Sequence, residues 1–540
     1  MKIQLIHGPT YLNPGALSSL GPAAPIGLAY VAAALRQEGH SVGVIDAIAE
    51  APEQRTRAGR LDRLGLTDQE VVDRIDPDTD AIGITSMFSF QWPLLREMAG
   101  AIRRARPDVA IVGGGEHLTA LPERSMRESA LDFIVLGEGE ETAVALFGAL
   151  EKDRAFDRRR LPGICWRAAD GTIVSNPRAA RRRDLDAIAW PAWDLFDLEV
   201  YDEHHYTTGN QYGKTVPILA TRGCPYQCTF CSSPNMWTPR WFARDPKDVV
   251  DEIAFYVKTY GADHFPFQDL TAVIRKRWIV EFCTELIARD LDVRWQLAAG
   301  TRCEAIDEEV VGLLYRSGCR ALYFAPESGS EVARKRIKKK LDTSALMRAA
   351  ELAIGAGLNL GAYLVIGFPE DTAEELEETV ALAKELGRLG LSDVACALFF
   401  PVPATPIWDD LVASGRIQVD DAHLMAPIFS HGKYQTEEFN FCKNVSARRL
   451  TWYKYKITAA FYSSLYRHHP DRIGKTVGYL LSGEEDSKLE ALLLQRWRHL
   501  TRHPAVARVV PRAWSGPVRP TGRRVPAAAQ RRRSSTVPAL

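Results

Sequence analysis

Three cysteines crowd into one short loop, and they constrain the fold more than any other feature of this chain. Cys224, Cys228 and Cys231 are spaced C-x3-C-x2-C and follow a short apolar run at 216–221. Such a run is typical of a buried strand. Three thiolates this close in sequence converge on one site only if the loop wraps around a metal. The fold must therefore place a metal centre at the end of this strand.

The number of local thiolates separates two kinds of metal site. A structural zinc site normally has four protein ligands, and no fourth Cys or His follows here at the spacing of a zinc finger. A [4Fe–4S] cluster with one open iron fits three thiolates better. A zinc loop closed by a distant residue is the alternative. We expect the remaining cysteines to be small buried apolar residues rather than ligands; they are Cys165, Cys283, Cys303, Cys319, Cys396 and Cys442.

Strand and helix patterns alternate over residues 1–150. Helical periodicity separates several of the short apolar runs, for example at 26–38 and 92–104. This alternation predicts an α/β domain with a doubly wound, Rossmann-like parallel sheet. Ligands of such sheets bind at the carboxyl ends of the strands. The predicted strands are 3–8, 42–46, 81–86, 109–113 and 133–137.

The alternation resumes over residues 214–415 and predicts a partial (β/α)6 barrel, whose active site is expected where the strands end. Residues 151–213 are interpreted as a connector. It is expected to contain a small hairpin, because Asp170-Gly171 is a strong hairpin turn signal. The predicted barrel strands are 216–221, 264–268, 294–298, 321–325, 360–366 and 393–399.

Residues 416–504 have a mostly helical pattern, and 505–540 form a basic segment without acidic residues that we expect to be disordered. Aromatic residues recur in the helical part at spacings of three and four, which predicts one apolar helix face. We expect this face to pack in the core, with a substrate wall as the alternative. Its members are Trp452, Tyr455, Ala459, Tyr462 and Tyr466.

Charge and hydropathy exclude several classes of protein. Lys+Arg and Asp+Glu both number 68, so the net charge is zero. General electrostatic binding of nucleic acid is therefore not expected. No apolar stretch reaches the roughly 18 residues of a membrane-spanning helix. The N-terminus is too short and polar for a signal peptide. Clustered thiols without a secretion signal predict a cytoplasmic protein in a reducing compartment.

The cysteine loop resembles the signature of the radical S-adenosylmethionine (SAM) superfamily. In that family three cysteines bind three irons of a [4Fe–4S] cluster, and SAM chelates the fourth. A doubly wound domain before such a barrel resembles the cobalamin-dependent radical SAM enzymes, and most closely their methyltransferases. The resemblance covers residues 1–415. It implies a [4Fe–4S] cluster, SAM and cobalamin as cofactors, and a flavodoxin- or ferredoxin-type electron donor.

Several barrel segments resemble further family motifs. A-P-E-S-G at 325–329 resembles G-x-E-S-G, with Ala325 in place of the usual glycine, and the 367–372 turn resembles G-x-P-x-[ED]-T. Its Thr372 is also a good helix N-cap. F-Q-D-L-T at 267–271 partly resembles F-x-D-D-x-x-T and leaves Asp269 as a candidate catalytic residue. The resemblance implies SAM contacts at Phe230, Gln268, Arg302, Glu327, Ser328 and Gly367.

Strand ends of the first domain resemble the loops that cradle cobalamin, where glycines let the backbone approach a bulky cofactor. No D-x-H-x-x-G sequence is present, so binding without a protein imidazole on cobalt is implied. His117 lies near the corrin or is a hydrogen-bonded loop residue. The bulky run 86–92 covers part of the corrin or packs under the barrel. The implied contacts are Thr10, Thr85, Ser86, Gly113, Gly114, Gly115, His117, Gly137, Glu138, Gly139 and Glu140.

The resemblance implies methylation of a carbon centre through methylcobalamin and a 5′-deoxyadenosyl radical, both facing one enclosed cavity. We expect a small-molecule substrate, free or carrier-bound, of a natural-product pathway such as antibiotic biosynthesis. One alternative is cobalamin-assisted cyclisation or rearrangement without methyl transfer. The other is a non-catalytic cluster- or cobalamin-binding sensor.

Overall fold

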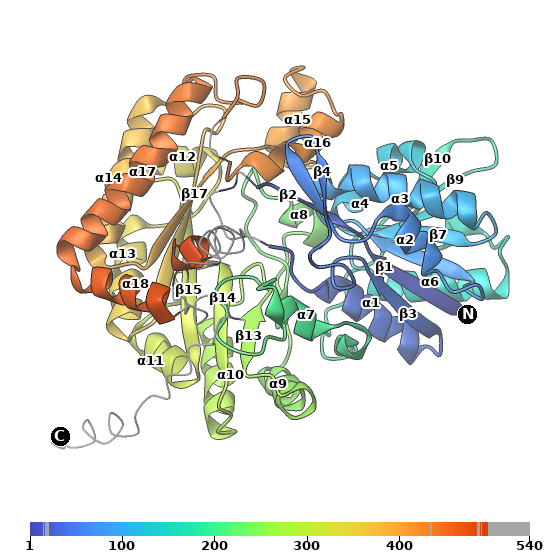
Figure 1. Ribbon diagram of the computed structural model, residues 1–540, viewed down its shortest axis with the longest axis horizontal. Coiled ribbons are helices and arrows are strands. Elements are labelled where there is room, and N and C mark those ends of the chain that lie inside the picture. The colour runs from blue at the N-terminus through green and yellow to red at the C-terminus, as the bar shows by residue number, and fades with distance from the viewer. Residues whose placement is uncertain (15, 17–20, 433–434, 483–486, 488, 495–540) are drawn as a thin grey trace, which may run out of the picture.

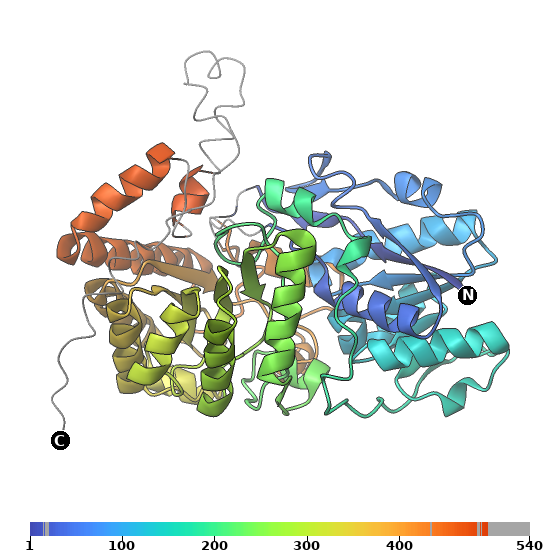
Figure 2. The same cartoon turned by 90° about the horizontal axis from the view of Figure 1, so that it is seen from below.

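The computed structural model describes residues 1–494 apart from 15, 17–20, 433–434, 483–486 and 488. The basic segment predicted at 505–540 lies outside the described residues. In two perpendicular views, an N-terminal α/β domain lies beside a barrel, and the N-terminus is at the end of the first domain that faces away from the barrel (Figures 1 and 2). Among the described helices, none combines the length and apolar character needed to cross a membrane.

The first domain is built on a seven-stranded sheet in the order β10-β9-β8-β7-β6-β1-β3. Strands β3, β1, β6, β7 and β8 are parallel, as the alternating pattern predicts. The predicted hairpin is present, but it pairs antiparallel with β8 and extends this sheet. The first sheet therefore continues past residue 150. The strands are β1 (Lys2–His7), β3 (Ser41–Asp46), β6 (Ala81–Thr85), β7 (Ala110–Gly114), β8 (Phe133–Val135), β9 (Ile164–Arg167) and β10 (Ile173–Ser175).

Helices cover both faces of this sheet, and a small side sheet in the order β2-β5-β4 lies against it. Nothing in the sequence pattern predicted the side sheet, whose strands have only three or four residues. These elements are β2 (Thr10–Leu12), β4 (Arg55–Ala58), β5 (Leu61–Leu64), α1 (Ile26–Gln37), α2 (Asp68–Asp73), η1 (Ser89–Gln91), α3 (Trp92–Ala105), α4 (Glu116–Ala120), α5 (Pro122–Glu128) and α6 (Glu140–Lys152). The segment that leads to the barrel contains η2 (Arg158–Arg160), η3 (Trp193–Leu195) and α7 (Leu198–Glu203).

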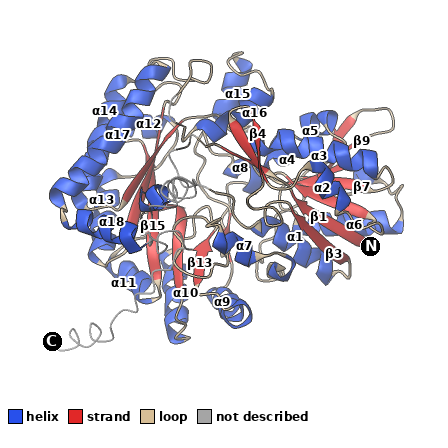
Figure 3. Ribbon diagram, viewed as in Figure 1, coloured by secondary structure: helices blue, strands red, loops and turns tan. Residues whose placement is uncertain are grey.

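The barrel contains five parallel strands in chain order, with helices on the outside (Figure 3). The strands are β13 (His264–Phe267), β14 (Arg294–Thr301), β15 (Cys319–Glu327), β16 (Asn359–Ile366) and β17 (Asp393–Leu398). The helices are α9 (Pro246–Tyr260), α10 (Lys276–Ala288), α11 (Glu308–Arg316), α12 (Glu331–Arg336), α13 (Thr343–Gly355) and α14 (Ala373–Leu389). Thr372 is the N-cap of α14 and forms a capping box with Glu375, which confirms its predicted helix-starting role.

The sixth predicted strand, at 216–221, is irregular. It pairs with β13 only through isolated bridges, such as Ile218 to Phe267. The chain then leaves the barrel as β11 (Thr221–Arg222), which pairs antiparallel with β12 (Phe242–Ala243). Because the strand turns away here, the loop that follows is free to fold over the barrel mouth.

The C-terminal region is helical, as expected, but its buried face differs from the predicted one. Helix α17 (Ala447–His468) packs against α14 and β17. Trp452 and Tyr455 are 52% and 45% exposed, and Ala459 is exposed as well, so the expectation of core packing is wrong for these three residues. A second set at the same spacing fills the interface instead: Leu450, Tyr453, Ile457, Phe461 and Leu465. The other C-terminal helices are α15 (Pro406–Ala413), α16 (Asp421–Met425), η4 (Ala426–Phe429) and α18 (Asp471–Ser482).

Candidate functional site

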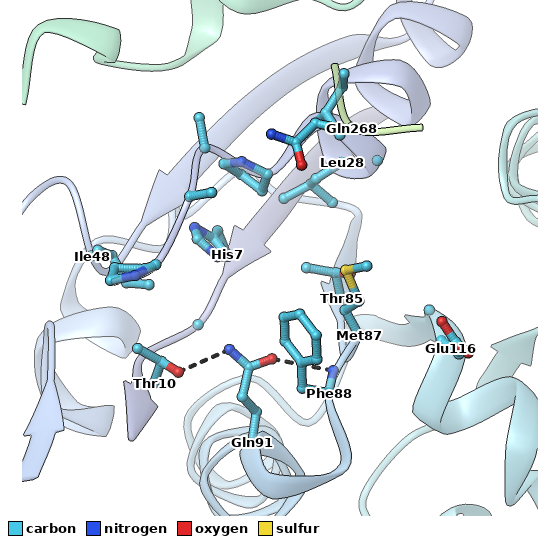
Figure 4. Close-up of a pocket in the computed structure, with 18 of the residues that line it drawn as sticks. His7, Thr10, Leu28, Ile48, Thr85, Met87, Phe88, Gln91, Glu116 and Gln268 are labelled. Atoms are coloured by element: carbon cyan, nitrogen blue, oxygen red, sulfur yellow. Dashed lines mark hydrogen bonds between the residues drawn. The ribbon is translucent and has the colours of Figure 1, made fainter. Parts of the chain in front are cut away.

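A cavity of about 1600 Å³ lies between the carboxyl edge of the first sheet and the barrel. The ends of β1, β6 and β7 form one wall, and Leu219, Thr221 and Arg222 contribute from the barrel side. Figure 4 shows His7, Thr10, Thr85 and Gln268 arranged around this space. Its volume exceeds the usual range of roughly 300–1,000 Å³ for sites of drug-sized ligands. The cavity therefore suits a large cofactor together with a second molecule.

Glycines leave bare backbone along the cavity wall. A Cβ added at Gly114 or Gly137 would meet no atom closer than 3.9 Å, apart from its chain neighbours. At Gly115, by contrast, φ is +111° and a Cβ would lie 2.5 Å from the carbonyl oxygen of Ser86, so only glycine fits this turn. This glycine-lined wall fits a bulky group that approaches the backbone, as cobalamin would.

Most of the predicted cobalamin contacts lie on the cavity wall, but two lie behind it. Ser86 and His117 are fully buried and are not among the described lining residues. The His117 ring packs against Trp92 with centroids 5.2 Å apart, and its Nδ1 lies 3.0 Å from Ser89 Oγ. Burial lowers the pKa of His117 to about 3. The structure therefore favours the hydrogen-bonded alternative for His117, but places the residue on helix α4 rather than in a loop. The wall residues are Thr10, Thr85, Gly113, Gly114, Gly115, Gly137, Glu138, Gly139 and Glu140.

Glu138 and Glu140 are engaged in ion pairs across the two domains. Arg222 donates to Glu140 Oε1 at 2.6 Å and to Glu138 Oε1 at 3.4 Å. Arg181 donates to the other Glu138 oxygen at 3.2 Å. Burial opposes ionisation of Glu140, but the Arg222 guanidinium outweighs it and holds the pKa of this carboxyl below its usual value. These carboxylates therefore join the cofactor loop to the residue before the cysteine loop.

Sequence reasoning missed a second polar group in the cavity wall. His7, the last residue of β1, places its Nδ1 3.0 Å from Asp46 Oδ1, and Tyr201 donates to Asp46 Oδ2 at 2.8 Å. A carboxylate behind an imidazole fixes the tautomer and orientation of the ring. One sequence feature could have predicted this: His7 lies at the end of an apolar strand, where ligands of such sheets bind.

The run 86–92 divides between the two alternatives that the sequence left open. Met87 and Phe88 are exposed and line the cavity (Figure 4). Trp92 is buried in the first domain. Gln91 fixes the turn between them, since it donates to Thr10 at 3.0 Å and accepts from the Phe88 N–H at 3.4 Å.

The cysteine loop lies between β11 and α8 (Ser233–Trp237). Its three thiols are partly exposed and free, whereas the six other cysteines are buried. Burial raises the pKa of Cys231 to about 12. Among the described residues, no three His, Cys, Asp or Glu side chains converge on a single ion. Three thiols in one loop form a soft donor set that fits an iron–sulfur cluster.

The predicted SAM contacts lie in the cysteine loop and on the barrel, and two of them link the loop to the barrel. The Phe230 ring packs against Phe368 with centroids 5.3 Å apart. Arg302 lies over the Tyr226 ring at 4.0 Å. Gln268 lines the large cavity and donates to Thr208 at 3.0 Å.

The strand-end segment at 325–329 is held by its neighbours. Glu327 is buried with φ +64° and accepts from Lys339 at 3.0 Å. Ser328 Oγ lies 3.3 Å from Thr379 Oγ1. Gly367 has φ +90°, and a Cβ there would lie 3.0 Å from Leu450. The positive φ and the close approach of Leu450 together account for glycine at 367. The buried Glu327 carboxylate with a positive φ is a strained position typical of functional sites.

Asp269 holds the end of the strand that precedes the cysteine loop. It accepts from the Ala220 N–H at 3.2 Å and from the Thr221 hydroxyl at 2.5 Å, and it is not among the described residues that line the cavity. Burial raises its pKa to about 6. These bonds explain the irregular strand at 216–221, because a side chain replaces the sheet as acceptor. The structure places Asp269 as a positioning residue rather than beside the cavity.

Comparison with known proteins agrees with this two-domain site. The B12 binding domain family matches residues 14–147 and the Radical SAM superfamily matches 218–383. An uncharacterized methyltransferase of Pyrococcus horikoshii is 30% identical over 420 residues, which cover 77% of this chain and 84% of the relative. The anaerobic magnesium-protoporphyrin IX monomethyl ester cyclase of Rubrivivax gelatinosus is 30% identical over 426 residues, covering 78% and 71%.

A solved structure shares the fold across both domains. It is the radical S-adenosylmethionine methyltransferase TsrM from Kitasatospora setae, with tryptophan substrate and a SAM analogue bound. The TM-score is 0.61 at 18% identity, and the match covers 85% of this chain and 88% of that one. With a cobalamin-binding domain, a radical SAM barrel and relatives that match over most of their length, this chain belongs to the cobalamin-dependent radical SAM enzymes, whose cofactors are cobalamin, SAM and a [4Fe–4S] cluster.

Proposed function

We propose that this enzyme transfers a methyl group to a carbon centre of a small molecule. The observation that carries the proposal is the shared cavity. Glycine-rich strand ends of the first domain and the residues just before the cysteine loop line one continuous space. Radical chemistry needs such an arrangement, because the reacting groups must be kept from solvent. The similarity to a methyltransferase over most of both chains supports methyl transfer.

The cofactors supply the hard chemistry when bound: SAM at the cluster provides a carbon radical, and cobalamin provides the methyl group. The chain supplies binding and orientation. Cys224, Cys228 and Cys231 would hold the cluster, and the glycine turns at 113–115 and 137–139 would hold cobalamin. Arg222 keeps these two parts in register through its ion pairs with the first domain.

Apolar side chains in the cavity favour a substrate with an apolar or aromatic part. Met87 and Phe88 project from the end of β6, and the Phe88 and Phe90 rings stack with centroids 5.4 Å apart. Tyr206 and Trp237 line the same cavity from the connector and from α8. These side chains would exclude water from the reacting carbon. This lining supports a small molecule with an apolar or aromatic part as the substrate.

Product analysis without substrate tests methyl transfer. The holoprotein, reduced anaerobically and given SAM, should form a single equivalent of S-adenosylhomocysteine per bound cobalamin, because the methyl group has a cobalt acceptor. The same protein without cobalamin is the control and should form none. No S-adenosylhomocysteine from cobalamin-loaded protein contradicts the proposal.

Cyclisation or rearrangement without methyl transfer is the second candidate, and the similarity to the cyclase supports it. Methyl-deuterated SAM separates the two when the holoprotein is incubated with a metabolite extract of the source organism. A product that carries the deuterated methyl group supports methyl transfer. A product that lacks the deuterated methyl group, and whose formation is accompanied by 5′-deoxyadenosine, supports cyclisation or rearrangement.

A further inference from the structure

A strongly basic segment lies directly on the cysteine loop, although the chain as a whole has no net charge. Six of the seven residues 334–340 are Arg or Lys. Together with the cysteine loop they border a groove of about 590 Å³, here called the basic groove. Its lining residues are Pro225, Tyr226, Gln227, Glu331, Arg334, Lys335, Lys338, Lys339, Lys340 and Leu341.

Half of these cations have structural partners within the barrel. Arg334 donates to the Ser328 carbonyl at 2.7 Å, Arg336 to Glu375 at 2.7 Å, and Lys339 to Glu327 at 3.0 Å. Packing and ion pairing account for these residues.

The other three point outward. Lys335, Lys338 and Lys340 are exposed, and Lys335 pairs only with the exposed Glu331 one helical turn away. Such an exposed ion pair contributes little to stability, because water and salt screen it. The three lysines thus present a positive surface that the fold itself does not need.

This surface lies against the cluster site. Cys228 Sγ lies 3.8 Å from the Lys338 carbonyl oxygen, and the Thr229 N–H donates to the Ile337 carbonyl at 3.1 Å. Pro225 and Gln227 of the same loop are exposed at the groove. The basic groove is therefore a place where the cysteine loop reaches the surface.

None of the described residues of the basic groove lines the large cavity. A substrate bound in the groove would be separated from the glycine-rich wall. A partner that needs contact with the cluster but not with the cavity is one that exchanges electrons. Positive surface potential speeds the association of an acidic protein and orients it.

We propose that the basic groove docks an acidic one-electron carrier protein, with a flavin or iron–sulfur centre, that reduces the cluster. The step is a single electron transfer: the carrier loses one electron, the cluster gains it, and no bond or proton is exchanged. This inference rests on the proposed radical function, which requires a reduced cluster.

Charge reversal at the groove tests the proposal. The variant Lys335→Glu, Lys338→Glu, Lys340→Glu is compared with wild type and with a matched control of the same charge change, Lys152→Glu, Arg159→Glu, Lys258→Glu, whose residues are exposed and lie outside the groove. Cluster reduction is followed by absorbance in the anaerobic, reconstituted holoprotein. The reductants are a recombinant acidic flavodoxin, a plant-type ferredoxin and a photoreduced deazaflavin.

With at least one of the carrier proteins, the groove variant should be reduced about 10- to 1,000-fold more slowly than wild type at low ionic strength. The control variant should react like wild type, and added salt should slow wild type toward the groove variant. Deazaflavin should reduce all three proteins equally. Equal rates of groove variant and wild type with both carriers overturn the proposal, and so does a wild type that neither carrier reduces.

SAM cleavage after deazaflavin reduction separates this proposal from the proposed function. Cleavage that is normal in the groove variant supports docking as the role of the groove. Cleavage lost only in the groove variant would make the groove an anion site for SAM or substrate and would overturn docking. Cleavage absent from reduced wild type would remove the radical function itself.

Discussion

Arg222 and Glu140 form an ion pair with a donor–acceptor distance of 2.6 Å, and this pair joins the barrel to the first domain. Arg222 is two residues before Cys224, and Glu140 is the first residue of α6. Both side chains are buried. Arg222 thus bridges two cofactor regions that are separated by more than eighty residues of chain, and Arg181 adds a second link through Glu138.

Arg222→Met should lower thermal stability strongly. Removing one partner of a buried pair leaves the other charge unpaired and costs about 3–5 kcal/mol. Differential scanning calorimetry of the apoprotein measures the loss. The variant Arg222→Met, Glu140→Gln removes the stranded charge and should recover part of the loss, while Glu138 keeps its ion pair with Arg181. Melting of Arg222→Met at the wild-type temperature would show that the pair does not hold the domains.

The pH dependence of stability should report the burial of His117. Its folded pKa is near 3, below the usual value of 6.5, so the unfolded state binds the extra proton as the pH falls. Stability is then complete above pH 6.5 and decreases below it by about 1.4 kcal/mol per pH unit for this group. His117→Gln should show a shallower loss between pH 6.5 and 5 in urea unfolding of the apoprotein. Equal slopes in the two proteins would mean that His117 is not buried in its neutral form.

Electron paramagnetic resonance of the cob(II)alamin form should show no nitrogen superhyperfine splitting from a protein imidazole. The chain lacks the D-x-H-x-x-G sequence, and His117 lies behind the cavity wall. His7 is the histidine of the first domain that lines the cavity. Splitting that disappears in His7→Gln but persists in His117→Gln would contradict the prediction and assign the ligand.

Glu327→Gln should slow SAM cleavage while leaving cobalamin content unchanged. Loss of a buried charge removes a polar contact worth roughly 1–3 kcal/mol, which corresponds to about 5- to 150-fold. Glu327 lies on the barrel and accepts from Lys339, so Lys339→Met is the control for loss of the ion pair alone. If both variants slow cleavage equally, Glu327 acts only through Lys339, and the predicted contact to SAM is wrong.

The local sequence pattern predicted the positions of most strands in both sheets. Buried parallel strands are short apolar runs, and segments with helical periodicity separate them. It did not identify partners distant in sequence. The Asp170-Gly171 turn predicted the hairpin, but not that β9 would pair with β8. The pairing of Glu138 and Glu140 with Arg222 has no local signal for the same reason.

Periodicity also failed where two sets of residues share one period. In α17, Leu450, Tyr453 and Phe461 repeat at nearly the same spacing as the aromatic set that begins at Trp452. The face that begins at Leu450 is the buried one, because α17 approaches α14 closely at Gly387. A Cβ at Gly387 would collide with the Phe461 carbonyl oxygen. Only the packed partner decides which face is buried.

The most direct test of the central claim is 5′-deoxyadenosine formation by the anaerobic, reconstituted protein with SAM and deazaflavin reductant. Wild type and a Cys319→Ala control should form it, because Cys319 is a buried core residue. The variant Cys224→Ala, Cys228→Ala, Cys231→Ala should hold almost no cluster iron and form none. A triple variant that keeps its iron and still forms 5′-deoxyadenosine would contradict the assignment of these three cysteines and, with it, the radical mechanism at this site.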